Sequence, residues 1–328
     1  MRLSPRLKYI SELVSDGKKI ADIGTDHGYI PISLLLDNKI SFAILSDINR
    51  GPLNNAKKEV VKNNLQKYVD LRLGSGMETL REGEVDQVII AGMGGILISE
   101  IIEKKINLSK KLDKLILQPM QAPEELRKYL LKKGFRIIDE HLVSEEHRIY
   151  EIIEAIYDKE PLSKNQGNVD FEQKKYTQYI YSLFEKYSDK LVYTNQYYKY
   201  VKERLNNIVV NHISEMDNNI NDKIIKKHIS SEATIDENLE NEINKLFFEV
   251  SKLVVSKRDK LLEAFLEKKI YECESIVLKM LGIETKNLNA TTLQAYNKNV
   301  KNKVEQVVIR KIILDLIKYD IKIKYDIE

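Results

Sequence analysis

Cysteine is almost absent from this sequence, and long apolar runs are absent altogether. Cys273 is the only cysteine among 328 residues, so the chain can form neither an internal disulfide nor a cysteine metal cluster. Its five histidines are scattered and offer little for zinc. No stretch approaches the roughly 20 consecutive apolar residues of a membrane helix, and the start of the chain lacks the apolar core of a signal peptide. We therefore expect a cytoplasmic protein with no membrane segment and no bound metal.

An excess of one charge is also missing. The net charge is +3, from 53 basic and 50 acidic residues, so bulk charge gives no strong argument for a nucleic-acid partner. Apolar residues make up 43% of the chain and charged residues 31%, which is typical of a folded globular protein. The length suffices for one large domain or two ordinary ones.

Glycine divides the chain into two halves. Eleven of the 13 glycines precede residue 140, where short apolar runs alternate with amphipathic stretches. This alternation predicts βα units and a parallel sheet that is covered on both faces. The predicted strands are Lys18–Ile23, Phe42–Ser46, Val69–Leu73, Gln87–Ala91, Leu115–Leu117 and Phe135–Ile138, followed by a closing edge hairpin of His141–Val143 and Tyr150–Ile156. The predicted helices are Pro31–Asp37, Pro52–Asn64, Ile96–Glu103 and Pro123–Lys133.

The second half predicts helices only. From Phe171 onward apolar residues recur at steps of three and four, except in the Asn-rich stretch 217–241, and a last helix is predicted over Thr291–Tyr319. We predict three parts: a ligand-binding α/β domain over 1–158, a helical hairpin or coiled coil over 159–225, and a helical extension over 226–328. Tyrosines are dense between Tyr176 and Tyr200, and packing in a core is favoured over an RNA-stacking surface.

The loop after the first predicted strand is rich in glycine and acid. Gly24 and Gly28 follow Asp22 and flank Asp26. Glycines let a backbone approach a ligand closely, but the Gly-x-x-x-Gly spacing differs from the GxGxxG that receives a pyrophosphate. Two carboxylates suit a cationic ligand without phosphate, such as S-adenosylmethionine, better than a nucleotide phosphate.

The later strands end in loops of the same kind. Asp47 ends the second strand about 20 residues past the glycine loop, where a ribose diol is usually held. An adenine ring would lie at the loop after the third strand, and substrates bind at such strand ends in open α/β sheets. The loops after strands three, four and five contain Gly74, Ser75 and Gly76, then Gly92, Met93, Gly94 and Gly95, then Gln118, Pro119 and Met120.

These motifs together resemble the TrmK family, the bacterial tRNA adenine-N1 methyltransferases that modify adenine 22. The resemblance covers roughly residues 1–158. It is carried by Asp22-Ile-Gly-Thr-Asp-His-Gly-Tyr-Ile-Pro31, Asp47 with Gly51-Pro52-Leu53, Leu71-Arg-Leu-Gly74, Ile90-Ala-Gly-Met-Gly-Gly95, Leu117-Gln-Pro119 and Ile149-Tyr-Glu-Ile152.

The resemblance implies a class I methyltransferase, with a Rossmann-like sheet, that binds S-adenosylmethionine along the strand ends. The implied contacts are Asp22, Gly24 and Gly28 to the amino-acid part, Asp47 to the ribose, Gly74, Ser75 and Gly76 to the adenine side, and Gly92, Met93 and Gly94 to the methyl-transfer pocket. His27 would shape the cofactor loop or touch RNA. Ser75 stands where the family commonly has Asp, and Met120 stands where it has Asn.

The implied reaction is methylation of adenine N1 in tRNA, with no obligate protein partner. Asp26 is the candidate catalytic residue, because a carboxylate can stabilise the positive charge that the methylated base acquires. The candidate RNA contacts are Arg6, Lys8, His27, Arg127 and Lys128. Two alternatives stay open: a catalytically degenerate RNA-binding protein, and an NAD-dependent oxidoreductase, against which the missing GxGxxG counts.

Overall fold

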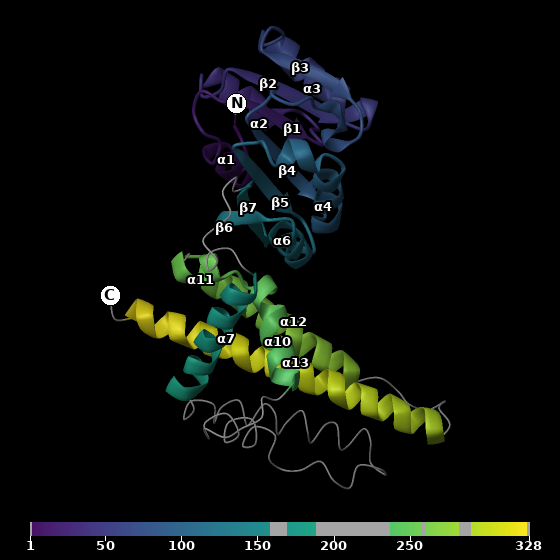
Figure 1. Cartoon of the computed structure of the whole chain (residues 1–328), viewed down its shortest axis with the longest axis vertical. Coiled ribbons are helices and arrows are strands. Elements are labelled where there is room, and N and C mark those ends of the chain that lie inside the picture. Colours follow the sequence, from purple (N-terminus) through teal and green to yellow (C-terminus); the bar gives the residue numbers. More distant parts are fainter. Residues whose placement is uncertain (1, 158–168, 188–236, 258–259, 282–289, 327–328) are drawn as a thin grey trace. The chain divides into compact units, whose positions relative to one another are not determined.

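The computed structural model describes residues 2–157, 169–187, 237–257, 260–281 and 290–326 (Figure 1). It divides into two compact units, each of which is described by itself. The first unit is Met1–Glu172 together with Phe248–Leu261, and the second is Gln173–Phe247 together with Leu262–Glu328. The segment Phe248–Leu261 therefore belongs to the first unit, although the predicted helical extension over 226–328 includes it.

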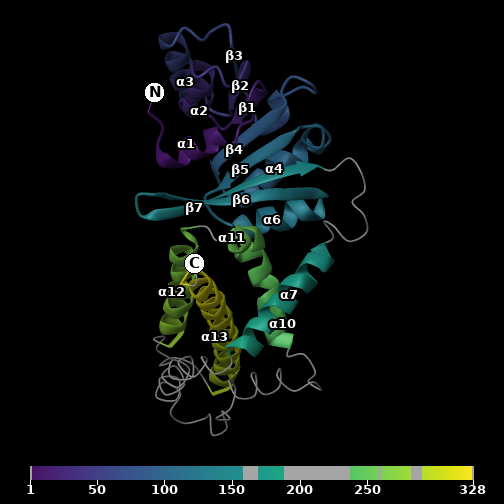
Figure 2. The same cartoon turned by 90° about the vertical axis from the view of Figure 1, so that its left-hand side faces the viewer.

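The first unit is built on a seven-stranded sheet with the order β3-β2-β1-β4-β5-β7-β6. The strands are β1 (Lys19–Ile23), β2 (Phe42–Asp47), β3 (Val69–Leu73), β4 (Gln87–Met93), β5 (Lys114–Pro119), β6 (Phe135–Glu145) and β7 (Arg148–Tyr157). The first five are parallel, and the β6–β7 pair is antiparallel at one edge, as Figure 2 shows. The predicted parallel sheet and its closing hairpin are confirmed.

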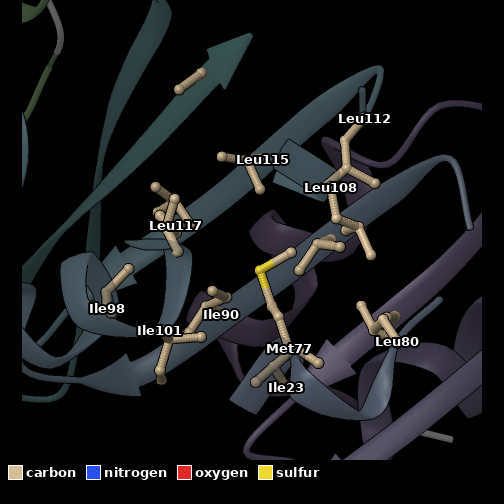
Figure 3. Close-up of a cluster of buried hydrophobic side chains, with 14 of the residues drawn as sticks. Ile23, Met77, Leu80, Ile90, Ile98, Ile101, Leu108, Leu112, Leu115 and Leu117 are labelled. Atoms are coloured by element: carbon tan, nitrogen blue, oxygen red, sulfur yellow. The ribbon is translucent and has the colours of Figure 1, made fainter. Parts of the chain in front are cut away.

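Helices cover both faces of this sheet, because alternate strand residues point to opposite sides. The helices are α1 (Pro5–Glu12), α2 (Tyr29–Leu36), α3 (Arg50–Lys62), α4 (Gly95–Lys104), α5 (Ile106–Ser109), α6 (Pro123–Lys132) and α11 (Lys252–Lys257), with a 3-10 turn, η1 (Gly76–Thr79). On β4, Ile90 faces a core with α4, α5 and α6, part of which Figure 3 shows, whereas Ile89 faces a core with α1, α2 and α3.

Two local features differ from the prediction. The expected separate strands Phe135–Ile138 and His141–Val143 are parts of one strand, β6, whose pairing with β7 shifts register between Ile137 and Asp139. A bulge of this kind breaks the alternation of apolar and polar residues, which is why the pattern suggested two strands. Helix α1 was not predicted. It has Ser4 as its N-cap, and its first residue is Pro5, a residue that favours the first helical position.

The described part of the second unit is all helical. It contains most of α7 (Val169–Lys186) and α10 (Glu237–Glu249), and all of α12 (Leu262–Leu281) and α13 (Ala290–Asp326). The buried carboxylate of Asp320 on α13 accepts hydrogen bonds from Tyr187 Oη at 2.7 Å, Lys186 Nζ at 3.1 Å and Tyr179 Oη at 3.3 Å. Among the described helices, none combines the length and the apolar character of a membrane span.

The described tyrosines of the dense segment lie in this helical core. Tyr176 and Tyr187 are buried, which supports packing over RNA stacking for these two side chains. The tyrosines from Tyr193 to Tyr200, the helix predicted between 188 and 216 and most of the Asn-rich stretch 217–241 lie outside the described residues. The coiled-coil character of this region stays a prediction.

Candidate active site at the strand ends

The structure brings the five predicted loops to one edge of the sheet, because parallel strands end on the same side. Backbone hydrogen bonds tie neighbouring loops together. The Gly24 and Thr25 amides donate to Ser46 O at 2.7 and 3.0 Å. The Gly74 amide donates to Asp47 O at 3.0 Å. The ends of β1, β2 and β3 therefore form one continuous rim.

Asp22 lies inside this rim and is 9% exposed. Burial raises the pKa of its carboxyl to about 6, the nearby Thr25 hydroxyl lowers it, and the charge of Asp47 raises it further. None of these contributions comes from a cation. The Thr25 hydroxyl is itself buried and has no hydrogen bond of good geometry among the described residues. A carboxylate and a hydroxyl are thus held in the interior with spare capacity for a polar, cationic ligand group.

Asp47 ends β2 and is half-buried. Its Oδ1 accepts the Asn49 backbone N–H at 2.6 Å, which fixes the carboxylate as the chain turns toward α3. The next residue, Ile48, is 65% exposed. A carboxylate beside an exposed apolar side chain suits a nucleoside, whose ribose has hydroxyl donors and whose base has an apolar face.

Gly24 and Gly92 are two of the four rim glycines with a positive φ, a conformation that glycine adopts more easily than other residues. Gly24 has φ +77°, and a Cβ placed there would overlap the Met93 side chain. Met93 therefore packs directly across the glycine loop. Gly92 has φ +81° and nothing within 4 Å of the position of a Cβ. The backbone at Gly92 is thus open where a Cβ would project.

The remaining predicted cofactor residues border the same rim. Gly28 is the N-cap residue of α2, Ser75 is the N-cap residue of η1, and Gly94 is the N-cap residue of α4. Close packing explains the small residue at Gly74, because a Cβ there would lie 2.6 Å from Thr79 Cγ2. All the predicted cofactor residues therefore lie on or next to the ends of β1 to β4.

Asp26 and His27 lie at the solvent side of the first loop. The His27 ring stacks on the Tyr29 ring with centroids 4.8 Å apart and an interplanar angle of 9°. His27 Nε2 lies 3.4 Å from Asp26 Oδ2, and the Asp26 side chain is 68% exposed. Water screens an exposed carboxylate strongly, so the catalytic role of Asp26 stays a prediction.

The prediction that Arg127 contacts RNA is wrong. Its side chain is 3% exposed, and it donates from Nε to Glu140 Oε1 at 2.6 Å, from Nη1 to Phe248 O at 2.8 Å, and from Nη2 to Glu151. Burial alone would lower the pKa of Arg127, but the charges of Glu140 and Glu151 raise it. Ser251 also donates to Glu140, so this cluster holds the Phe248–Leu261 segment on the first unit.

The other predicted RNA contacts differ in accessibility. Lys8 and Lys128 are exposed cations that pair with exposed glutamates, Glu12 and Glu125, and the Lys128 ammonium also lies over the Phe248 ring, 5.5 Å from its centroid. Arg6 points into the protein, where its Nη1 donates to Gln118 Oε1 at 2.6 Å. Lys8 and Lys128 therefore stay candidates for phosphate contacts.

The sequence analysis placed Gln118 in the loop after the fifth strand but assigned it no role, and it missed the apolar character of the rim. Gln118 is fully buried at the end of β5, and a glutamine between an apolar run and Pro119 is the signal that could have marked it as a buried polar group. The large apolar side chains exposed at the strand ends are Tyr29, Ile48, Leu73, Ile96, Leu97 and Met120. Such a group of exposed apolar side chains beside two carboxylates is typical of a ligand site.

One group of potential metal ligands lies away from the rim. Asp139, His141 and Glu154 place ligand atoms within 4.8 Å of one another. Lys114 Nζ already bonds Glu154 at 2.7 Å, Lys257 pairs with Asp139, and His141 Nε2 lies 2.9 Å from Glu154. Ammonium groups thus supply the positive charge that these carboxylates require, and we assign the group to packing of α1 and α11 on the hairpin.

Known proteins provide a separate comparison. A family model described as "Methyltransferase domain" matches residues 3–153. The tRNA (adenine(22)-N(1))-methyltransferase of Bacillus subtilis (strain 168) is 38% identical over 155 residues, which are 47% of this chain and 65% of that protein. A Mycoplasma genitalium protein named "Putative tRNA methyltransferase MG248" is 31% identical over 156 residues, which are 46% of this chain and 68% of that protein. The structure of an uncharacterized protein from Listeria monocytogenes serotype 4b has the same fold, with a TM-score of 0.60, 20% identity, and coverage of 93% of this chain and 98% of that one.

The strand order, the glycine loops and the matched domain define a Rossmann-like methyltransferase. The identity to the Mycoplasma protein extends over more than two thirds of that relative. The chain belongs to the TrmK family of bacterial tRNA methyltransferases. The match spans 65% of the Bacillus relative, just under two thirds of its length.

Proposed function

We propose that this chain transfers the methyl group of S-adenosylmethionine to N1 of an adenine in tRNA, at the position that corresponds to adenine 22, in the cytoplasm. One observation carries the proposal. Asp22 and Asp47 end adjacent strands beside the open glycine loop at Gly92, in a chain that is 38% identical over 155 residues to a tRNA (adenine(22)-N(1))-methyltransferase. Family membership argues against an NAD-dependent oxidoreductase.

The residues of the rim fit this cofactor. Its amino-acid part carries an ammonium group, which matches the buried Asp22 carboxylate that no described cation neutralises. The Thr25 hydroxyl offers a further hydrogen bond next to Asp22. Asp47 would accept from the ribose hydroxyls, and Ile48 would cover one face of the adenine ring. Ser75, between Gly74 and Gly76, would lie toward the other side of that ring.

Alignment is the main task of the protein in this chemistry. The bound cofactor supplies an electrophilic sulfonium methyl group. Adenine N1 carries a lone pair, so holding the two in line supplies much of the rate enhancement. The open backbone at Gly92 leaves room for the base, and Met93 and Met120 flank it from β4 and β5. Asp26 would stabilise the positive charge of the methylated base.

The RNA would be held by contacts outside the cofactor rim. Lys8 and Lys128 present exposed cations for phosphates, and the stacked His27–Tyr29 pair presents an aromatic face. Ile96, Leu97 and Met120 expose apolar surface on the β4 and β5 side, where an extruded base could pack. Extrusion of a stacked base costs a few kcal/mol, which such contacts would have to offset.

The decisive experiment is methyl transfer from labelled S-adenosylmethionine to unmodified tRNA transcripts. We expect label in a transcript with adenine 22 and none when that adenine is replaced by guanine. Mapping should place the label at N1, and the Asp47→Ala variant should lose activity through weaker cofactor binding.

The degenerate alternative makes a different prediction. Ser75 and Met120 stand where the family commonly has Asp and Asn, and a protein that had lost catalysis would bind tRNA in a salt-sensitive manner without transferring label. Binding without transfer, under conditions in which calorimetry shows bound S-adenosylhomocysteine, would replace our proposal with that one.

A further inference from the structure

Arg6 is held in a fixed position by the β6–β7 hairpin. Its backbone N–H donates to Glu145 Oε2 at 2.8 Å, and its guanidinium lies over the Tyr150 ring, 5.2 Å from the centroid. The side chain is 19% exposed, and Nη1 donates to Gln118 Oε1 at 2.6 Å. Arg6 thus reaches from α1 to the end of β5.

This contact determines which way the Gln118 amide faces. A guanidinium has only donors, so the oxygen of Gln118 must face Arg6 and its NH2 group must face the other way. In that orientation Nε2 donates to Pro119 O at 2.9 Å and contacts Met120 Sδ at 3.5 Å. The fully buried amide therefore links Arg6 to the Pro119–Met120 turn.

The Pro119–Met120 turn lies next to the proposed methyl-transfer loop. Met93 pairs with Pro119 between β4 and β5, and the Met120 N–H donates to Met93 O at 2.8 Å. The Met120 side chain is 40% exposed at the rim. A shift of this turn would move both the loop at Gly92 and the apolar surface that faces the substrate base.

We propose that Arg6 is a positioning residue for methyl transfer, which acts through the amide of Gln118 on the Pro119–Met120 turn. The inference rests on the proposed function, and it replaces the earlier expectation that Arg6 binds an RNA phosphate. Its physical basis is that in-line transfer tolerates little displacement, and a shift of about 1 Å can cost about 100-fold in rate.

The rival explanation is that Arg6 merely ties α1 to the sheet. Gln118→Glu separates the two explanations. Glutamate keeps an oxygen toward Arg6, where the contact becomes charge-assisted and stronger, but it removes the NH2 group that faces Pro119 O. If Arg6 only ties α1 to the sheet, the Gln118→Glu variant should keep the wild-type rate of methyl transfer. If Arg6 acts through the NH2 group of Gln118, the rate should fall.

The experiment compares Arg6→Ala, Arg6→Lys and Gln118→Glu with wild type, and uses Lys18→Ala as the control. Lys18 pairs with Asp113 at the opposite edge of the sheet, so its loss removes a cation without touching the site. The readouts are thermal unfolding, calorimetric affinity for S-adenosylhomocysteine, and the single-turnover rate of tRNA methylation at saturating tRNA and cofactor.

We expect Arg6→Ala and Gln118→Glu each to lower the saturated rate about tenfold or more, with cofactor affinity within about twofold of wild type. Arg6→Lys should recover part of the rate, because an ammonium group also donates only. A wild-type rate in Gln118→Glu overturns the inference. So does an Arg6→Ala variant whose defect disappears at saturating tRNA, since that is the behaviour of a lost phosphate contact.

A second readout keeps this inference separate from the proposed function. Hydrogen exchange of the Met120 amide reports the turn directly, because that amide bonds Met93 O. We expect faster exchange in Arg6→Ala and Gln118→Glu and no change in Lys18→Ala. If wild type methylates no tRNA, the proposed function fails and exchange alone decides the positioning role. Unchanged exchange in both variants overturns that role whatever the activity.

Discussion

The charge of Asp47 at the end of β2 raises the pKa of Asp22 at the end of β1. The two carboxylates end adjacent parallel strands, and the more buried of the two, Asp22, has its pKa raised to about 6 by burial first and by Asp47 in addition. An arrangement that concentrates negative charge disfavours the cofactor-free protein and favours a cationic ligand.

Cofactor affinity should weaken at acidic pH. A protonated Asp22 is neutral and loses its attraction for the ammonium group of the ligand. Since the pKa of Asp22 is about 6, affinity for S-adenosylhomocysteine should be constant above about pH 7 and fall about tenfold per pH unit below 6. Calorimetry from pH 8 to pH 5 measures this directly. Asp22→Asn should bind weakly at every pH, and an unchanged affinity of wild type at pH 5 would contradict the assigned ammonium contact.

The same substitution should stabilise the cofactor-free protein. The folded pKa of Asp22 lies above its ordinary value of 3.8. Below 3.8 both states are protonated and there is no cost; as the pH rises from 3.8 to about 6 the unfolded state ionises first and the folded state loses stability, and the full cost is present above about 6. Asp22→Asn should therefore raise the free energy of unfolding by on the order of 1–3 kcal/mol at pH 7 and by almost nothing at pH 4. Urea unfolding of wild type and Asp22→Asn at the two pH values tests whether the substitution raises or lowers the free energy of unfolding. A loss of stability at pH 7 would contradict the predicted cost.

Gly92 and Gly51 both have room for a Cβ atom, but replacing them with alanine should have opposite effects on the free energy of unfolding. Gly92 has φ +81°, so Gly92→Ala should lower the free energy of unfolding by about 1–2 kcal/mol through backbone strain alone, and should slow methyl transfer. Gly51 in α3 also has nothing within 4 Å of a Cβ position but has no positive φ. Gly51→Ala should therefore be neutral or stabilise by up to about 1 kcal/mol. Equal destabilisation in both variants would show that strain at Gly92 is not the cause.

Much of the fold could be predicted because its signals are local. Four of the five parallel strands contain a short apolar run, and β1 to β4 end in or next to a glycine or an acid, so the loops that form most of the rim were recognisable before their contacts were known. The bulge at Asp139 could not be predicted, because polar residues inside a strand have the same pattern as a turn. Helix α1 is short, and it was missed although Ser4 and Pro5 mark its start.

The surroundings of the basic side chains were harder to predict from the sequence than those of the acidic side chains at the strand ends. Arg127 and Lys128 are neighbours on α6, and both look like solvated helix residues. Burial by long-range partners distinguishes them. Arg127 is enclosed by Glu140, Glu151 and the carbonyl of Phe248, which is 121 residues away, whereas Lys128 stays exposed although its ammonium lies over the Phe248 ring. Gln118 posed the same difficulty, because its partner Arg6 lies 112 residues away.

Arg127 and Lys128 therefore form a matched pair for testing stability. Arg127→Met keeps most of the side-chain volume but leaves Glu140 and Glu151 buried without their cation, which should cost about 3–5 kcal/mol in the free energy of unfolding. Lys128→Ala removes an exposed ion pair with Glu125 and a cation–π contact with the Phe248 ring, and should change stability by no more than about 1 kcal/mol. Denaturant unfolding of the two variants measures both values.

The same pair should separate fold stability from RNA binding. A phosphate contact releases counterions, so if Lys128 makes one, Lys128→Ala should reduce the slope of log affinity for tRNA against log salt by about one. Arg127→Met, measured below its unfolding temperature, should leave that slope unchanged, because a side chain that is 3% exposed can release no counterion. A reduced slope in Arg127→Met would mean that the cluster opens when RNA binds. An unchanged slope in Lys128→Ala would remove Lys128 from the RNA interface.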